Sequence, residues 1–118
     1  MCGRYYRRSN KQEIADAFHV RGDLSNLILG PANYNVAPNT LQPVIRNNEP
    51  TGDREIALMS WGLIPYYSKD ARFKDFSTIN ARAESVSNSK IWKRPFERSR
   101  CLVPIDGFYE GKADVYPF

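Results

Sequence analysis

Leu41–Arg46 (LQPVIR) and Glu55–Trp61 (EIALMSW) are two apolar segments separated by the turn-forming residues NNEPTGD. Apolar and β-branched residues bounded by Asn, Pro and Gly predict two strands joined as a hairpin. Pro43 has no backbone N–H to donate to a neighbouring strand, which predicts that the first strand lies at a sheet edge. The hairpin therefore indicates a fold rich in antiparallel sheet.

Shorter elements are expected on both sides of this hairpin. Ser9 followed by Gln12 fits a capping box, and apolar residues at helical spacing then predict a short amphipathic helix over Asn10–His19. A second helix is expected over Ser89–Arg98, where Pro95 must either start the helix or break it. His19, the only histidine, is expected at the end of the first helix as a surface residue.

The C-terminal third continues the pattern of short strands. Cys101–Ile105 is apolar and predicts a strand, and a turn then leads into the extended segment Phe108–Glu110. The alternation of strands, turns and two helices predicts a single α+β domain over residues 1–118. Tyr116–Phe118 has the pattern of an interrupted strand. We therefore expect residues 1–118 to be the N-terminal and middle portion of a longer domain whose C-terminal part is missing.

The composition is that of an ordinary folded protein. Of the 118 residues, 42% are hydrophobic and 25% are charged. No apolar run approaches the ~18 residues of a membrane-spanning helix, and the first arginines are followed by polar residues where a signal peptide would be apolar. These observations predict a cytoplasmic protein. The net charge of +4 suits a polyanionic partner.

The two cysteines, Cys2 and Cys101, lie far apart and lack the spacing of a disulfide framework or a zinc site. Cys101 is in an apolar segment, which predicts a buried and inert thiol. Cys2 follows Met1, so removal of Met1 would place a free amine and a thiol on one residue. Such an amine condenses with an aldehyde to an imine, and the thiol then closes a thiazolidine ring. Both groups ordinarily titrate close enough to neutrality to be partly reactive there.

Five short motifs follow one another along the chain. They are Cys2-Gly3-Arg4, YNVAP at 34–38, WGLIP at 61–65, NARAE at 80–84, and RCLVP at 100–104 running into DGFYE at 106–110. Their order and spacing resemble the SOS-response-associated peptidase (SRAP) family, which crosslinks to abasic sites in single-stranded DNA. The resemblance runs over essentially the whole chain. It implies a strongly twisted, mostly antiparallel sheet that forms a pseudo-barrel with a few short helices.

The resemblance implies a catalytic role for three residues. Cys2 matches the family's nucleophile, which forms a thiazolidine with the aldehyde of the opened sugar. Asn80 matches an asparagine that orients the reacting groups, and an amide can both donate to an oxygen and accept from an amine. Glu110 matches a glutamate that moves protons, which imine formation and ring closure both require. From the residues alone, Asn80 is more simply a helix cap and Glu110 a solvated strand end.

The resemblance also implies five DNA-binding residues. Arg4 and Arg82 match arginines that hold phosphates, for which a guanidinium fork is well suited. Trp61 and Pro38 match apolar surfaces around the lesion, where a base can stack. Tyr67 replaces a tryptophan of the family and keeps an aromatic ring. Taken by itself, Trp61 at a strand end is more simply a core residue.

Two further departures concern the C-terminal part of the pattern. Gly111 stands where the family usually has a tryptophan. The family's catalytic histidine lies farther along than residue 118, and His19 is in the wrong place to substitute for it. The missing histidine is expected to affect reversal of the crosslink more than its formation.

Three functions are compatible with these residues. The leading interpretation is covalent capture of abasic sites in single-stranded DNA by a monomer that is cytoplasmic and nucleoid-associated, with no metal or organic cofactor. An alternative is an N-terminal cysteine peptidase or hydrolase, with autoproteolysis as a possible activity, that uses the same nucleophile and its own amine as base. The third is a non-catalytic module that binds single strands through arginines and aromatic rings. The substitution Cys2→Ser distinguishes abasic-site capture from hydrolysis. The substitution Cys2→Ala distinguishes both of these activities from non-catalytic binding.

Overall fold

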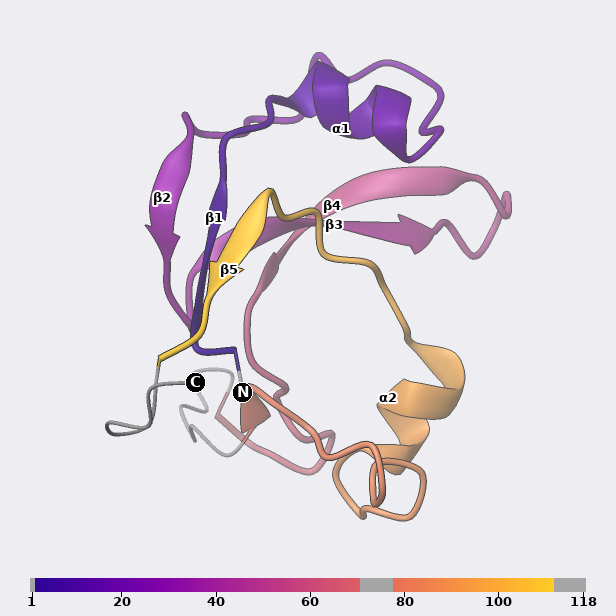
Figure 1. Cartoon of the computed structure of the whole chain (residues 1–118). Helices are drawn as coiled ribbons and strands as arrows, with labels where there is room; N and C mark the ends of the chain where they lie inside the picture. The colour runs from indigo at the N-terminus through magenta and orange to yellow at the C-terminus, as the bar shows by residue number, and fades with distance from the viewer. Residues whose placement is uncertain (1, 71–77, 112–118) are drawn as a thin grey trace.

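The computed structural model of the protein describes residues 2–70 and 78–111. Five strands and two helices lie within these ranges (Figure 1). In chain order they are β1 (Arg4–Arg7), α1 (Lys11–Ala17), β2 (Asn33–Val36), β3 (Leu41–Asn47), β4 (Arg54–Ser60), α2 (Lys93–Arg98) and β5 (Gly107–Tyr109). This mixture confirms the expected α+β class with antiparallel pairing.

The strands form two antiparallel sheets. The first has the order β2-β1-β5, so the first strand of the chain lies in its centre. The second is the β3–β4 hairpin. Within the described residues these sheets do not close into a barrel, and the pseudo-barrel stays a prediction.

The β3–β4 hairpin confirms the prediction made from its two apolar segments. Its register runs without interruption from Leu41 opposite Ser60 to Asn47 opposite Arg54. Pro43 is tolerated because β3 is indeed an edge strand. On its outer side the described chain adds only the isolated bridge between Ile45 and Leu102.

Helix α1 was predicted correctly, but its cap was placed one residue too early. Asn10 is the N-cap, accepting from the Glu13 backbone N–H, while the Glu13 carboxylate accepts from the Asn10 N–H. Ser9 is not available for capping because its hydroxyl and its backbone N–H both donate to Asp106. His19 is exposed just beyond the helix, as expected.

The predicted elements near the C-terminus are shorter than expected. Turns occupy most of 89–92, and α2 covers only Lys93–Arg98. Pro95 fits because it lies in the first turn, where its missing N–H would have no partner within the helix. Cys101–Ile105 is not a strand, since only Leu102 forms a bridge there. The extended segment that follows is confirmed as β5, and Tyr116–Phe118 lies outside the described residues.

Cys101 also differs from its prediction, because the structure leaves it exposed. Protein atoms on one side of the thiol raise its pKa by desolvation, although the residue as a whole is in contact with solvent. The apolar neighbours Leu102 and Val103 are exposed too, at 58% and 47%. A run of apolar residues predicts a buried strand only where a second sheet or helix covers it.

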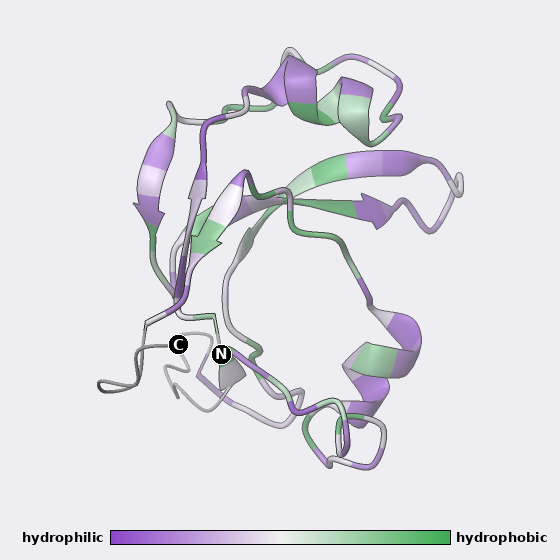
Figure 2. Ribbon diagram, viewed as in Figure 1, coloured by the Kyte–Doolittle hydropathy of each residue, from purple (hydrophilic) through white to green (hydrophobic). Residues whose placement is uncertain are grey.

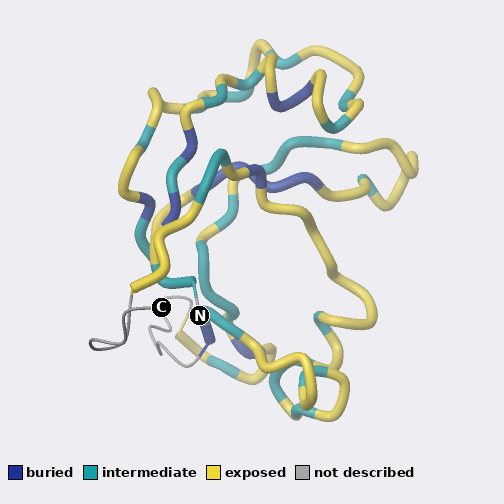
Figure 3. Tube along the Cα trace, viewed as in Figure 1, coloured by how far each residue is buried: buried dark blue, intermediate teal, exposed yellow. Residues whose placement is uncertain are grey.

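The core lies between the two sheets and α1. Its buried hydrophobic residues are Tyr5, Ile14, Ala15, Val36, Val44 and Ile45. Figure 3 shows these buried stretches along β1, β3 and α1. Arg54 of β4 donates to the backbone oxygen of Phe18 at 2.8 Å and ties the end of α1 to the hairpin.

A buried arginine fixes the loop that leads into β2. The Arg7 guanidinium donates to the backbone oxygens of Ser9, Gly30 and Pro31 at 2.7, 3.2 and 2.9 Å. Because Arg7 is in β1 and is only 4% exposed, this contact holds the central strand in place. β1 in turn determines where Cys2 lies.

Asp106 joins the start of β5 to the end of β1. Its carboxylate accepts from the backbone N–H of Arg8 and of Ser9 at 2.7 and 3.0 Å, and from the Ser9 hydroxyl at 2.8 Å. The hydrogen bond from the Ser9 N–H is the largest cause that lowers the carboxyl pKa of Asp106. The side chain is 17% exposed, so solvent screens these contacts only partly.

We predict that Asp106→Asn lowers the free energy of unfolding by about 1–2 kcal/mol at neutral pH, because one amide oxygen replaces a charged acceptor. Folding lowers the pKa of Asp106. Its contribution to the free energy of unfolding is therefore fully present at pH values above the ordinary pKa range of a carboxyl group. It is lost as the pH falls through the folded-state pKa. Urea unfolding at neutral and acidic pH measures both effects. Equal stability of the two proteins at neutral pH would contradict the prediction.

No helix in the described ranges is long and apolar enough to cross a membrane.

Candidate active site

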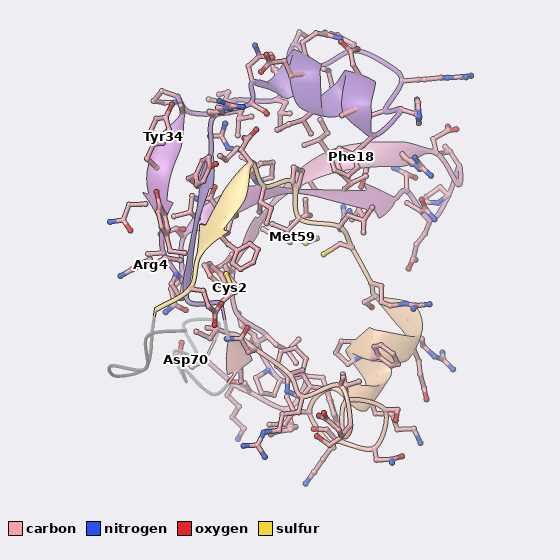
Figure 4. The ribbon with its side chains drawn as sticks, viewed as in Figure 1. Cys2, Arg4, Phe18, Tyr34, Met59 and Asp70 are labelled. Carbon is pink, nitrogen blue, oxygen red and sulfur yellow. The ribbon has the colours of Figure 1, made fainter. Side chains whose placement is uncertain are left out.

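Four strand ends place the candidate residues at one edge of the molecule. Cys2 lies just before β1, and Pro38 just after β2, because the two strands are antiparallel with Tyr5 opposite Val36. Trp61 follows β4, and Glu110 follows β5. The turn after Pro38 is joined to Trp61, whose backbone oxygen accepts from the Asn39 N–H at 2.9 Å. Figure 4 shows Cys2 at the start of β1, close to the end of β5.

Asn80 comes directly to Cys2. Its Nδ2 donates to the Cys2 backbone oxygen at 3.0 Å, which joins residues 78 positions apart. The Cys2 thiol donates a weaker bond to the backbone oxygen of Arg4 at 3.4 Å. Cys2 is half-buried, so its position is fixed while one side stays accessible. The expected pairing of these two residues is therefore present as a contact.

Trp61 holds the Asn80 segment in place. Its indole Nε1 donates to the Ile79 backbone oxygen at 3.3 Å, and the Leu63 N–H donates to the Thr78 oxygen at 3.1 Å. The turn between these contacts requires Gly62, whose φ of +128° is unfavourable for other residues. Trp61 is half-buried with its ring 5.3 Å from that of Tyr5. It is both part of the packing and partly accessible.

The register of β1 and β5 brings Glu110 near Cys2. Arg4 lies opposite Tyr109 in this antiparallel pair. Gly3, which precedes Arg4, and Glu110, which follows Tyr109, are therefore neighbours. Glu110 is exposed at this edge.

Gly107 makes the close approach of β5 to β1 possible. A Cβ at this position would collide with the ring of Tyr6. That ring cannot simply move aside, because it is held between the rings of Tyr34 and Tyr109 at centroid distances of 6.0 and 5.9 Å. The sequence predicts only a turn at this glycine and not the close approach of the two strands.

Tyr5 lies beside Trp61 and Cys2 and was not among the residues predicted from the sequence. It is 4% exposed, and within the described structure its hydroxyl has no hydrogen-bond partner. Burial raises its pKa, Arg7 opposes this and Cys2 adds to it, so the hydroxyl stays neutral beside the thiol. A buried hydroxyl without a partner costs about 1–3 kcal/mol, and it can donate to a group that enters the site. The alternation of β1, with Tyr5 and Arg7 both inward, was the available signal.

The remaining three candidates lie farther from the hydrogen bond between Asn80 and Cys2. Arg4 and Arg82 are exposed at the rim, two residues beyond Cys2 and Asn80 respectively. Tyr67 is 50% exposed and packs edge-on against Tyr66 at 5.3 Å, on the side facing α2. The structure thus groups Cys2, Asn80, Trp61, Glu110 and Pro38, with the arginines beside them and Tyr67 farther along the loop.

Residues 2–70 and 78–111 contain no group of three or more His, Cys, Asp or Glu side chains that could hold a metal ion. The candidate site is a cysteine whose backbone oxygen accepts a hydrogen bond from the Asn80 amide, at the same edge as the Glu110 carboxylate and the Trp61 indole. These features define a cysteine site close to the start of the chain, at the edge of an antiparallel sheet.

Comparisons with known proteins extend this description. The family model for SOS response associated peptidase (SRAP) matches residues 1–117. The chain is 34% identical over 112 residues to the abasic site processing protein YoqW of Bacillus subtilis, covering 95% of this chain and 48% of that protein. It is 40% identical over 82 residues to the abasic site processing protein YMR114C of Saccharomyces cerevisiae, covering 69% and 21%.

A vertebrate relative gives a similar match. The abasic site processing protein HMCES of Mus musculus is 34% identical over 86 residues, which is 65% of this chain and 24% of that protein. The chain belongs to the SRAP family. It spans about half the length, or less, of these curated relatives.

Proposed function

We propose that this protein captures abasic sites in single-stranded DNA through Cys2 after Met1 is removed. The observation that carries the proposal is the 3.0 Å hydrogen bond from Asn80 to the Cys2 backbone oxygen. It fixes the residue whose amine and thiol must both reach one carbon atom. The names of the relatives, all abasic site processing proteins, support this substrate.

The reaction needs no oxidant and no cofactor. The Cys2 amine adds to the aldehyde carbon of the opened sugar, and the resulting carbinolamine loses one water to give an imine. The thiol then adds to the imine carbon, forming a C–S bond while a proton moves from sulfur to nitrogen. Each thiazolidine formed therefore releases one water molecule.

The residues around Cys2 have separate tasks in this mechanism. Glu110 donates a proton to the departing hydroxyl and accepts one when the thiol adds, as a carboxylate can in general acid–base catalysis. Asn80 orients Cys2 so that amine and thiol approach the same carbon, which lowers the entropic part of the barrier. The Tyr5 hydroxyl can donate to an oxygen of the opened sugar. Trp61 and Pro38 form an apolar surface beside the lesion, and Arg4 and Arg82 hold phosphates.

A denaturing gel tests this function. The protein is incubated with a single-stranded oligonucleotide that carries one abasic site, and separately with the same oligonucleotide after its aldehyde is reduced to an alcohol. We expect a covalent band with the first and none with the second. Equal bands, or no band from folded protein that lacks Met1, would contradict the proposal.

A further inference from the structure

The basic charge of this chain is concentrated in one short segment that the proposed site does not use. Residues 90–100 (KIWKRPFERSR) contain five basic side chains and one acidic one, which gives +4. The whole chain also has a net charge of +4, from 17 basic and 13 acidic residues. Removing five and one leaves twelve of each, so the other 107 residues are neutral overall. We call Lys90, Lys93, Arg94, Arg98 and Arg100 the α2 basic surface.

These five side chains are exposed and are not neutralised by neighbours. All five are exposed to solvent, and within the described part of the chain none makes a hydrogen bond or an ion pair through its charged group. By contrast, Arg46 is paired with Glu55 at 2.6 Å, and Arg8 lies 3.7 Å from Asp106. The free charges of the α2 basic surface are therefore available to an anionic partner.

Burial in the protein core does not explain the composition of this segment. Helix α2 has six residues, none of them buried, and its N-cap residue Trp92 makes no capping hydrogen bond through its side chain. So short a helix gains little stability from its own hydrogen bonds. Figure 2 shows α2 as mainly hydrophilic, interrupted by one hydrophobic band. A solvent-exposed helix needs charged residues, but solvation alone does not require basic residues to outnumber acidic ones by five to one in this segment.

Aromatic rings lie among the basic groups. Lys90 Nζ is 5.6 Å from the centre of the Tyr67 ring, and the Arg94 guanidinium is 6.0 Å from that of Tyr66. Tyr66 and Tyr67 are 68% and 50% exposed. Exposed rings alternating with cations are the combination that binds single strands, because bases stack on the rings while the cations hold phosphates.

Two cavities adjoin this surface and share one arginine. A cavity of about 540 Å³ lies between Tyr66 and α2, and is lined by Lys90, Lys93, Arg94 and Arg98 among others. A second, of about 590 Å³, is lined by Arg98 and Arg100 together with Arg46 and the hairpin loop. Arg98 lines both cavities, and the second one is also lined by Glu49 and by Glu55, the partner of Arg46, so the unpaired basic groups are concentrated on the α2 side.

One loop links this surface to the candidate active site. At the start of this loop, Trp61 packs against Tyr5. Farther along, Tyr66 lies against Arg94 and Tyr67 lies against Lys90. Figure 1 shows this segment running from the end of β4 toward the side of the molecule that carries α2. A strand that leaves the site along this loop therefore reaches the α2 basic surface.

We propose that the α2 basic surface binds the phosphate backbone of the single-stranded DNA on one side of the abasic site. This inference rests on the proposed function for the position of the lesion. Nucleic acid is favoured over an acidic protein or an anionic membrane because the exposed rings accompany the cations. The contacts hold the strand in place without taking part in the covalent step.

The test compares two pairs of substitutions with equal loss of charge. Arg94→Gln/Arg98→Gln removes two members of the surface, and Arg8→Gln/Arg21→Gln removes two exposed arginines elsewhere. Affinity is measured at several salt concentrations for a single-stranded oligonucleotide with a non-reactive tetrahydrofuran in place of the abasic sugar. For the α2 pair we expect roughly ten- to thirtyfold weaker binding near 0.1 M salt, and a salt slope smaller by about 1.4. The control pair should change both quantities much less.

Further readouts separate this inference from the proposed function. At saturating abasic DNA the crosslinking rate of the α2 pair should equal that of the unaltered protein. Lys90→Gln/Lys93→Gln should reproduce the loss of affinity, which guards against a folding defect in one variant. If the α2 pair binds as the control pair does, or if anionic vesicles retain the protein better than the oligonucleotide does, the inference fails. If affinity depends on α2 but no crosslink ever forms, the inference stands and the proposed function fails.

Discussion

Cys2→Ser is expected to abolish the stable crosslink to abasic DNA, lowering its yield by more than about a thousandfold. Serine keeps the amine, so an imine can still form, but a hydroxyl does not close a stable ring on the imine carbon. The remaining imine hydrolyses on work-up. When catalytic residues act together, removing the nucleophile alone abolishes nearly all of the rate enhancement. Gel quantification of the covalent band measures the effect.

The chain supplies its own matched control for this substitution. Cys101 is also a free and exposed thiol, but its nitrogen is held in a peptide bond. Cys101→Ser should therefore leave crosslinking unchanged. Inserting alanine between Met1 and Cys2 should have the same effect as Cys2→Ser, since it keeps the thiol and removes the α-amine. A crosslink that survives the insertion would show that the thiol alone reacts.

The same variants test the alternative functions. A hydrolase that uses an N-terminal nucleophile would retain part of its activity with serine at position 2. A non-catalytic binding module would lose neither affinity nor function in Cys2→Ala. Only the capture mechanism requires both the amine and the thiol.

Asn80→Ala should slow crosslinking by about a hundredfold, because misplacing reacting groups by about an ångström has consequences of that size. The amide donates to the Cys2 backbone oxygen at 3.0 Å, and within the described residues its side chain is the group that joins the 78–80 segment to Cys2. Asn80→Asp should be at least as slow, since a carboxylate would face a carbonyl oxygen. Asn26→Ala, at an exposed turn, serves as the control.

Two measurements distinguish a positioning effect from a general defect. Affinity for the tetrahydrofuran oligonucleotide should change less than threefold in Asn80→Ala, because the contact is within the protein, whereas the single-turnover rate should fall. If affinity and rate fall together, Asn80 acts on DNA binding. If neither changes, the hydrogen bond to Cys2 has no part in the reaction.

The elements that local sequence determines were predicted correctly. The β3–β4 hairpin follows from two apolar segments around a turn, and its pairing needs no distant partner. The cap of α1 was misplaced because Ser9, a good capping residue, is bound by Asp106, almost one hundred residues away. The 101–105 segment was predicted as a strand from its apolar residues alone. Propensity cannot show that only Leu102 finds a partner.

The site was predictable in its chemistry and not in its geometry. The reactivity of an N-terminal cysteine depends on one residue, so the sequence is sufficient to suggest it. The approach of Asn80 to Cys2 depends on Trp61 and the turn at Gly62, which connect segments distant in the chain. Tyr5 was missed because tyrosine in a strand is ordinary.

The α2 basic surface was missed for a different reason. Ile91, Trp92 and Phe96 lie at roughly helical spacing, and the segment was therefore predicted only as a helix. In the structure Phe96 is 40% exposed, and no residue of α2 is buried. A hydrophobic pattern indicates which face of a helix could be covered, but whether it is covered depends on neighbours that the pattern does not include.

The most direct test of the central claim is the intact mass of the protein before and after incubation with an abasic oligonucleotide, followed by peptide mapping of the product. The mechanism predicts a starting mass without Met1 and a product heavier by one oligonucleotide less one water, attached at residue 2. A crosslink at any other residue, or folded protein that lacks Met1 and gains no mass, would contradict it.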